Sequence, residues 1–371
     1  MKLKEIKEGS ISLLIPDPEE YRKEGRFDPS WAPVFYNPRM VLNRDISVAF
    51  VKAMGVKSVV DSMSATGVRA LRYKVEAGVD AVIANDRNPN AVELITKNAE
   101  LNRVQITVYN RDANSLLYET KAEYVDLDPF GTPVPFLGSA IWASTRYLGV
   151  TATDLTALEC ASKSSARRKY DVVCEKLSFS KEVGIRVLLG KIAREAASLE
   201  KGVTPLLSFY YDYYYRVFLR VERGSGRAKR TLSNLGYYYE CPKCGFRVVE
   251  HECKGEMKCP KCGSRMRSAG PLWTGKLGEE DVIGGVLQNV QSREEQDLLI
   301  QILSEVRYNE PYYDTDFLAS LYKINPPRIT HMVKCLGEAT RTHFDKKGFK
   351  TNRGFEDVIS CLDPQRERSS S

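Results

Sequence analysis

Two Cys-x-x-Cys-Gly segments carry the most specific chemical signal in the sequence. Fourteen residues separate them, and together they supply four thiols: Cys241, Cys244, Cys259 and Cys262. A turn of this kind directs two thiolates at one ion, and four thiolates complete the closed tetrahedral site typical of structural Zn²⁺. His251 and Cys253 lie between the pairs and could substitute, although the four-sulfur set is complete without them. The spacing therefore predicts a zinc ribbon at residues 241–262.

Acidic residues follow three successive predicted strands: Asp61, Asp86 and Asp112, the last followed by Ala113. The loop at 61–69 is rich in small residues, which lets backbone approach a ligand closely. The glycine signatures of phosphate-binding loops are absent. We therefore predict an S-adenosylmethionine site, in which the loop faces the methionine moiety, Asp86 accepts the ribose hydroxyls and Asp112 accepts from the adenine amino group.

The fourth predicted strand ends in Asp126-Leu-Asp128-Pro129-Phe130-Gly131. This segment resembles the Asp/Asn/Ser-Pro-Pro-aromatic motif of amino-methylating enzymes, although Phe and Gly follow the proline here. An exocyclic amine of a base is a poor nucleophile, because its lone pair is delocalised into the ring. Asp128 and a backbone carbonyl directed at the amine would each accept a hydrogen bond from one of its two N–H groups, which localises the nitrogen lone pair. Phe130 could stack on an extruded base.

These side chains need an α/β domain to position them. Between about residues 45 and 155, short apolar runs alternate with amphipathic stretches, which predicts a doubly wound parallel sheet of Rossmann type. Strands are expected at 58–61, 81–86, 105–109, 124–127 and 149–153, and helices at 46–54, 68–77, from 89 onward and at 136–147.

The alternation of apolar runs and amphipathic stretches gives way after about residue 205 to a segment rich in aromatic and β-branched residues, so we predict a domain boundary there. The aromatic segment Ser208–Val221 is expected to be one strand, followed by a basic flexible loop at Gly224–Arg230. Three helices and a basic hairpin would then form a winged-helix-like unit, at 292–307, 315–323, 327–337 and 341–351.

Length and composition set the broad class. The 371 residues suffice for two domains, and the net charge of +7 is compatible with a polyanionic partner. Five of the nine cysteines are scattered singly, which favours a reduced compartment over a disulfide framework. No apolar run approaches the ~20 residues that span a bilayer, so we expect a cytoplasmic protein with no membrane partner.

Several motifs in fixed order carry a resemblance to one family. The chain resembles the archaeal and eukaryotic tRNA (guanine-26-N2) dimethyltransferases over nearly its whole length. The matching motifs are Asn37-Pro38-Arg39-Met-Val-Leu-Asn43-Arg44-Asp45, Asp61-x-x-Ser64-Ala-Thr-Gly67-x-Arg69, Asp126-Leu-Asp128-Pro-Phe-Gly131, Val150-Thr-Ala-Thr-Asp154 and Ala339-Thr-Arg-Thr-His343-Phe344.

This resemblance implies a class I fold, two successive methyl transfers to N2 of a guanosine in tRNA, and no DNA substrate. Asp128 would orient the guanine amino group with Arg44 nearby, and Phe35 and Phe130 would sandwich the flipped base. The residues implied to bind S-adenosylmethionine are Arg39, Arg69, Asp86, Asp112 and Ala113. Residues 1–205 would form the methyltransferase domain and 206–371 a tRNA-binding domain, in a protein acting as a monomer.

Two other functions share part of this pattern. An amino-methylase acting on DNA would have the same motif after the fourth strand. A zinc-ribbon RNA-binding protein could use an inactive methyltransferase domain as scaffold, although the intact set of acids argues against it: Asp61, Asp86, Asp112 and Asp128.

Overall fold

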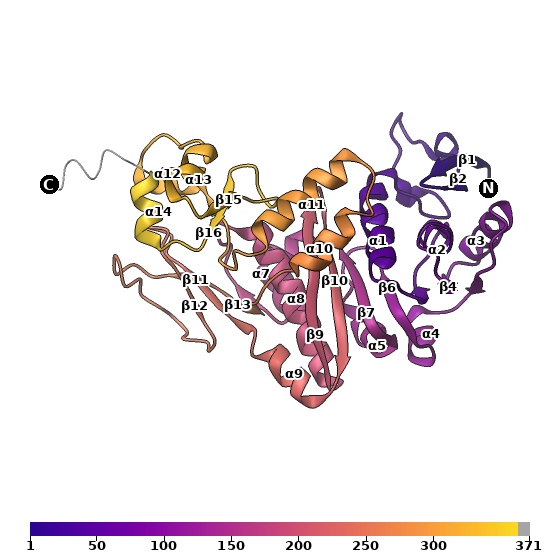
Figure 1. Cartoon of the computed structure of the whole chain (residues 1–371), viewed down its shortest axis with the longest axis horizontal. Coiled ribbons are helices and arrows are strands. Elements are labelled where there is room, and N and C mark those ends of the chain that lie inside the picture. The colour runs from indigo at the N-terminus through magenta and orange to yellow at the C-terminus, as the bar shows by residue number, and fades with distance from the viewer. Residues whose placement is uncertain (363–371) are drawn as a thin grey trace. The chain divides into compact units, whose positions relative to one another are not determined.

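The computed structural model describes residues 1–362 (Figure 1). By its internal contacts the chain divides into two compact units. Unit 1 comprises Met1–Thr151, Phe218–Glu222 and Gly284–Gln296. Unit 2 comprises Ala152–Val217, Arg223–Ile283 and the chain from Asp297 onward. The assignment of separate functions to residues 1–205 and 206–371 stays a prediction.

A seven-stranded sheet has the order β5-β4-β3-β6-β7-β10-β9. Its strands are β3 (Ser58–Asp61), β4 (Ala81–Asn85), β5 (Thr107–Tyr109), β6 (Ala122–Leu127), β7 (Ser144–Ala152), β9 (Lys201–Tyr211) and β10 (Tyr214–Arg223). The pairs among the first five strands in this order are all parallel. This order confirms the predicted α/β fold and places a topological switch point between β3 and β6.

Helices connect the parallel strands, as the alternating pattern predicts. They are α2 (Val68–Val75), α3 (Pro89–Leu101), α4 (Ala113–Glu119) and α5 (Leu137–Ala143), preceded by α1 (Val41–Ala53). Asn88 caps α3, since its side chain accepts a hydrogen bond from the backbone N–H of Asn90. The predicted helix at 136–147 was too long, because β7 begins at Ser144.

The sheet is mixed, whereas the sequence predicted only parallel strands. The segment expected to be one strand is a hairpin of β9 and β10, which turns at Asp212 and Tyr213. Asp212 adopts a φ of 50°, and few other turn signals mark the position. The predicted loop at Gly224–Arg230 was also wrong: α9 spans Ser225–Leu232, and its Thr231 side chain accepts a hydrogen bond from the Val203 N–H.

An N-terminal hairpin, β1 (Leu3–Glu8) and β2 (Ile11–Pro16), was not predicted. Its alternating apolar side chains Ile11, Leu13 and Ile15 pack in one cluster with Val68 and Leu71 of α2. This packing holds the hairpin against α2, and Glu8, the last residue of β1, is the one buried residue of that strand.

Unit 2 contains a long buried helix, α8 (Ser180–Ser198), and an antiparallel sheet of order β12-β11-β13-β8. The strands of this sheet are β8 (Val173–Cys174), β11 (Leu235–Glu240), β12 (Arg247–Glu250) and β13 (Arg267–Trp273). The sequence did not predict α8, whose apolar residues cover most of its surface rather than one stripe.

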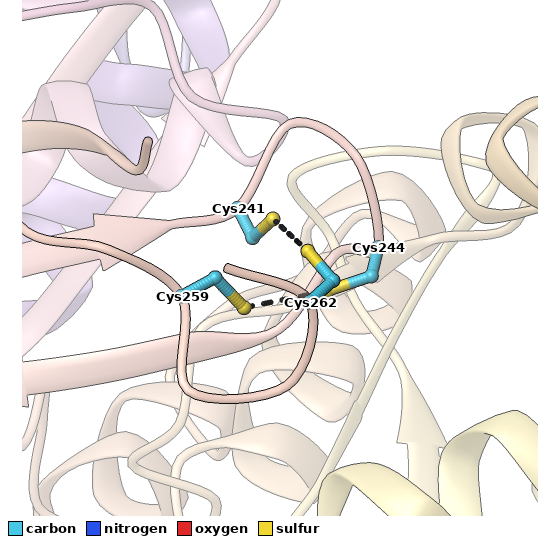
Figure 2. A group of neighbouring side chains, drawn as sticks. All are labelled: Cys241, Cys244, Cys259 and Cys262. Atoms are coloured by element: carbon cyan, nitrogen blue, oxygen red, sulfur yellow. Dashed lines mark hydrogen bonds between the residues drawn. The ribbon is translucent and has the colours of Figure 1, made fainter. Parts of the chain in front are cut away.

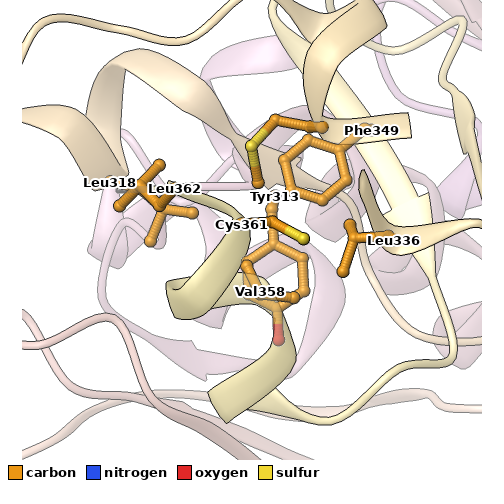
Figure 3. Packing of buried hydrophobic residues seen from close by; sticks show 8 residues of the cluster. Tyr313, Leu318, Leu336, Phe349, Val358, Cys361 and Leu362 are labelled. Carbon is orange, nitrogen blue, oxygen red and sulfur yellow. The ribbon is translucent and has the colours of Figure 1, made fainter. Parts of the chain in front are cut away.

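The C-terminal part of unit 2 packs helices on a small sheet of order β14-β16-β15. Its buried core joins Leu318, Met332, Phe349 and Val358 among others (Figure 3). The elements are α11 (Arg293–Glu305), which begins in unit 1, β14 (Tyr313–Asp314), α12 (Thr315–Tyr322), α13 (Ile329–Leu336), β15 (Ala339–Arg341), β16 (Gly348–Thr351) and α14 (Phe355–Leu362). The predicted helices correspond to α11, α12 and α13, but the shared core contains α14 rather than α11.

Two disulfides correct the expectation that the cysteines outside the four-sulfur set stand alone. Cys160 is bonded to Cys174, and Cys335 to Cys361. Each pair joins positions at least 14 residues apart in sequence, and such pairing is set by the fold rather than by local spacing. Within residues 1–362, no helix has both the length and the apolar character needed to cross a bilayer.

Candidate active site

Three aspartates meet at the switch point because β3 and β6 run side by side. Asp61, the last residue of β3, is in register with Asp126 of β6, and Asp128 follows immediately after β6. Arg69, on the first turns of α2, reaches both strand ends: its Nη2 lies 2.5 Å from Asp128 Oδ2 and its Nη1 3.8 Å from Asp126 Oδ2. The predicted cofactor residue Arg69 and the predicted catalytic residue Asp128 are therefore direct partners.

Arg69 is held from its other side by α1. Its Nη1 donates to Asn43 Oδ1 at 3.1 Å and to Ser47 Oγ at 2.9 Å. Burial opposes the charge of Arg69, but the carboxylates of Asp126 and Asp128 outweigh burial and hold its pKa well above the ordinary value. The guanidinium is thus a fixed cation that orients Asp128.

Of these three aspartates, only Asp61 has a buried carboxylate oxygen that lacks a hydrogen bond in the described chain. Its Oδ2 is buried and has no hydrogen-bond partner within residues 1–362. Burial and the charge of Asp126 raise the pKa of Asp61 to about 7. A buried, unpaired acceptor at this position fits a ligand that brings a donor or a positive charge.

Asp86 and Asp112 stand at the carboxyl ends of β4 and β5. Asp86 is half-buried and accepts from the Ala65 N–H and the Asn88 N–H, both at 2.9 Å, so it fixes the loop after β3. Asp112 is exposed and caps α4 by accepting from the Ser115 N–H at 3.2 Å, while Ala113 is buried. Both carboxylates are locally anchored and lie beyond neighbouring parallel strands.

Arg44 lies in a buried ion-pair network that the sequence did not predict. It binds both carboxylate oxygens of Glu8 at 2.6 Å and donates to the Asn37 carbonyl at 3.2 Å. Glu8 also accepts from Arg72 Nη1 at 3.0 Å and from the Tyr36 hydroxyl at 2.8 Å. Burial would raise the pKa of Glu8, but the two arginines outweigh it and lower the pKa. Glu8 stands in a charged N-terminal strand, and no local motif distinguishes it.

Phe35 and Phe130 contact each other directly. Their ring centroids are 4.4 Å apart with the planes at 87°, and Phe130 is 71% exposed. This edge-to-face contact leaves no room for a base between the rings, so a sandwich would require one ring to move. Arg39 is exposed within the short 3₁₀ turn Pro38–Met40.

The four predicted metal ligands converge in unit 2 (Figure 2). Their Sγ atoms all lie within 4.8 Å of one another, with Cys241 to Cys262 at 3.5 Å and Cys244 to Cys259 at 3.6 Å. Zn–S bonds of about 2.3 Å in a tetrahedron imply S–S edges of about 3.8 Å, which this cluster approximates. His251 and Cys253 are outside the cluster of ligand atoms in the described chain.

Glycines explain the local shape of both cysteine turns. Gly245 and Gly263 adopt φ values of 80° and 72°, and their N–H groups donate to the carbonyls of Cys241 and Cys259. A side chain at these positions would strain the turn. The donor set therefore fits a closed tetrahedral metal site.

Comparisons with known proteins agree with this architecture. The sequence profile of the family described as N2,N2-dimethylguanosine tRNA methyltransferase matches residues 18–363. A tRNA (guanine(26)-N(2))-dimethyltransferase of Sulfurisphaera tokodaii is 51% identical, with 98% of this chain and 99% of that protein covered. One of Sulfolobus acidocaldarius is 47% identical over the full length of both chains. A solved structure, Trm1 from Pyrococcus horikoshii in complex with S-adenosyl-L-methionine, superposes with a TM-score of 0.86 at 33% identity, covering 97% of this chain and 99% of that one.

Proposed function

The chain belongs to the N2,N2-dimethylguanosine tRNA methyltransferase family, and on this premise we propose that it methylates N2 of the guanosine at position 26 of tRNA, twice in succession, with S-adenosylmethionine as methyl donor. One observation carries the proposal: Asp128 stands beyond β6 at the switch point, oriented by the buried Arg69 and still 23% exposed at its side chain. A carboxylate placed in this way can accept hydrogen bonds from an incoming amine.

Residues of unit 1 fit the cofactor. When bound, S-adenosylmethionine supplies an electrophilic methyl group on a sulfonium. Asp86 would accept its ribose hydroxyls and Asp112 its adenine amino group beside Ala113. The unpaired Oδ2 of Asp61 suits a cationic or hydrogen-donating part of the same ligand.

Asp128 prepares the amine. Its carboxylate accepts a hydrogen bond from an N–H group of the guanine N2 and thereby localises the nitrogen lone pair on the side from which the methyl group arrives. The methylated nitrogen then loses one proton to solvent, which leaves one N–H bond on the first product, so the same carboxylate can orient it for the second transfer. Arg69 holds Asp128 in place and acts as a positioning residue.

The segment around Phe35 would close on the base. Phe35 and Phe130 would stack on the two faces of the flipped guanine after their edge contact opens. Arg44 would act by holding the Asn37 carbonyl, which positions Arg39 two residues later for the cofactor.

The C-terminal residues would bind tRNA. The four cysteines would hold Zn²⁺ as a structural ion of a zinc ribbon, and the unit built from α12, α13 and the β15–β16 hairpin would act as a winged-helix-like module. Phosphate contacts by basic side chains of residues 206–371 would anchor the substrate.

Nucleoside mass spectrometry tests the proposal. An unmodified tRNA transcript incubated with the protein and S-adenosylmethionine should yield N2-methylguanosine and then N2,N2-dimethylguanosine. A transcript carrying adenosine at position 26 is the matched control and should yield neither, and duplex DNA should acquire no methyl groups. Absence of both products from the guanosine transcript would refute the activity.

A further inference from the structure

A pocket of about 440 Å³ with mixed polar and apolar lining lies within unit 2, directly after β7. Its volume falls in the range of small-molecule sites and suffices for a nucleoside. Hydroxyl groups and one ion pair supply its polar lining, from Thr153, Asp154, Thr156, Ser165, Lys169 and Tyr213, and Leu155 and Ala157 add an apolar part. The motif ending at Asp154 is one that the proposed methyl transfer does not use.

The helix α7 (Lys163–Tyr170) forms one wall of this pocket. Ser165 and Lys169 are one turn apart and both line it, whereas Ala166 and Tyr170 are buried. Arg168 lies three residues after Ser165, so it borders the pocket-facing side. Arg167 points about half a turn away from that side.

Two of the four positive charges on this helix lack protein partners in the described chain, whereas Lys163 pairs with Glu175 and Lys169 with Asp154. The side chains of Arg167 and Arg168 are exposed and form no hydrogen bond or ion pair with any residue up to 362. The two nearby acids, Asp154 and Asp171, already have lysine partners. An exposed, unpaired guanidinium one helical step from the pocket-facing side of α7 suits a phosphate group.

Those acids cannot neutralise the arginines. Asp154 accepts from the Tyr170 hydroxyl at 2.6 Å and from Lys169 Nζ at 3.2 Å. Asp171, at the end of α7, binds Lys191 Nζ at 2.7 Å. The exposed face of α7 therefore keeps its positive charge.

We propose that this pocket binds one nucleotide of the substrate tRNA, with the nucleoside among the hydroxyls and its phosphate on Arg168. The inference rests on the proposed tRNA substrate. The topology of the sheet favours this inference. Because β6 and β7 pair in parallel, their carboxyl ends share one edge of the sheet, and Asp128 and Thr153 follow directly after these two ends. The ion pair with Asp154 holds the Lys169 side chain in the pocket wall.

Binding of the unmodified transcript to the full-length protein, measured by fluorescence anisotropy over a salt series, tests this site. Arg168→Ala should weaken binding several-fold at moderate salt and reduce the slope of log affinity against log salt by about 1. Arg167→Ala is the matched control, since it removes the same charge from the same helical turn on the other side; its effect should be clearly smaller. Thr156→Trp, which fills the pocket from an exposed position, should weaken binding about tenfold with a nearly unchanged salt slope.

Hydrogen exchange supplies a second measurement. Amides of residues 153–157 and 163–170 should gain protection on addition of tRNA but not of S-adenosylmethionine. Equal losses in Arg167→Ala and Arg168→Ala, or an unaltered Thr156→Trp variant, would overturn the site and leave only diffuse electrostatic attraction. Binding does not require methyl transfer, so failure of this site and failure of the proposed activity give different results.

Discussion

Asp128 differs from its neighbour Asp126 in a way that suits a residue that touches substrate. Both bind Arg69, but the Asp126 side chain is completely buried, whereas that of Asp128 is 23% exposed. We expect Asp128→Asn to lower turnover by about 100-fold or more, because an amide can no longer accept in the same way. Affinity for S-adenosylmethionine should change little, since Arg69 keeps Asp126, Asn43 and Ser47 as partners.

Single-turnover kinetics and calorimetric titration of the cofactor separate these two effects. Asp112→Asn is a suitable control: it should raise KM for S-adenosylmethionine while leaving turnover at saturation nearly intact. If Asp128→Asn instead lost cofactor affinity with normal turnover, the amine would have to be activated by another residue.

Asp61 makes stability depend on pH. Burial and the charge of Asp126 raise its pKa from 3.8 to about 7. Between these values the native state keeps a proton that the unfolded chain has lost, so the free energy of unfolding falls as pH rises from about 4 to 7 and this contribution is constant above. The whole effect is on the order of 4 kcal/mol.

Asp61→Asn should remove this dependence. Urea unfolding of the ligand-free protein at pH 5, 6, 7 and 8 should show the variant gaining stability relative to wild type up to about pH 7. Parallel curves for the two proteins would mean that Asp61 ionises normally in the native state.

Among the elements, the two cysteine turns lie between β11 and β13 and share one small core, against which five partly buried side chains pack: Tyr237, Cys244, Phe246, Val248 and Met257. Their core contains Tyr239, Cys241, Cys259 and Met266. A core of this size needs the metal to remain folded. We expect Cys241→Ser to release Zn²⁺ and to increase hydrogen exchange over residues 237–267, as measured with a colorimetric chelator and by mass spectrometry.

Cys253→Ser is the matched control for the metal site. Cys253 is an exposed free cysteine in the same segment, outside the cluster of ligand atoms, so its loss should leave metal content and exchange unchanged. Equal metal loss in both variants would assign Cys253 to the coordination set.

Local signals predicted the parallel half of the sheet well. Ser58–Asp61 was predicted with its observed bounds, and α3 begins after the predicted cap Asn88, because strand–helix alternation and capping are encoded in neighbouring residues. The hairpin of β9 and β10 was missed because most side chains are buried on both strands and only Arg223 is exposed, which removes the alternation that marks a turn.

In the candidate site, too, residues with a local sequence signal could be predicted and residues without one could not. Asp61, Asp86 and Asp128 could be predicted because each directly follows or ends a strand. Glu8 could not, because its contacts with Arg44 and Arg72 join positions 36 and 64 residues apart. Likewise Glu305 accepts from the Thr342 hydroxyl and contacts His343, so the Thr-His pair of the last motif is tied to α11 by a partner that no local pattern reveals.

Across the chain, the proposed ligands divide between the two compact units. Every residue proposed for the cofactor lies in unit 1, and all four cysteines proposed to hold the metal lie in unit 2. Each ligand should therefore stabilise its own unit. S-adenosylmethionine at 100 times its Kd adds about 2.7 kcal/mol to the state that binds it, whereas a chelator removes the free energy of metal binding from unit 2 alone.

Differential scanning calorimetry with and without each treatment measures this division. A chelator should lower one unfolding transition and leave cofactor affinity nearly unchanged, whereas S-adenosylmethionine should raise the other. Affinity for tRNA should fall after chelation, because residues 206–371 are proposed to supply phosphate contacts. A single transition that both treatments shift equally would show that the units unfold together, and loss of cofactor binding on chelation would place the metal in the methyl-transfer site rather than in a separate structural element.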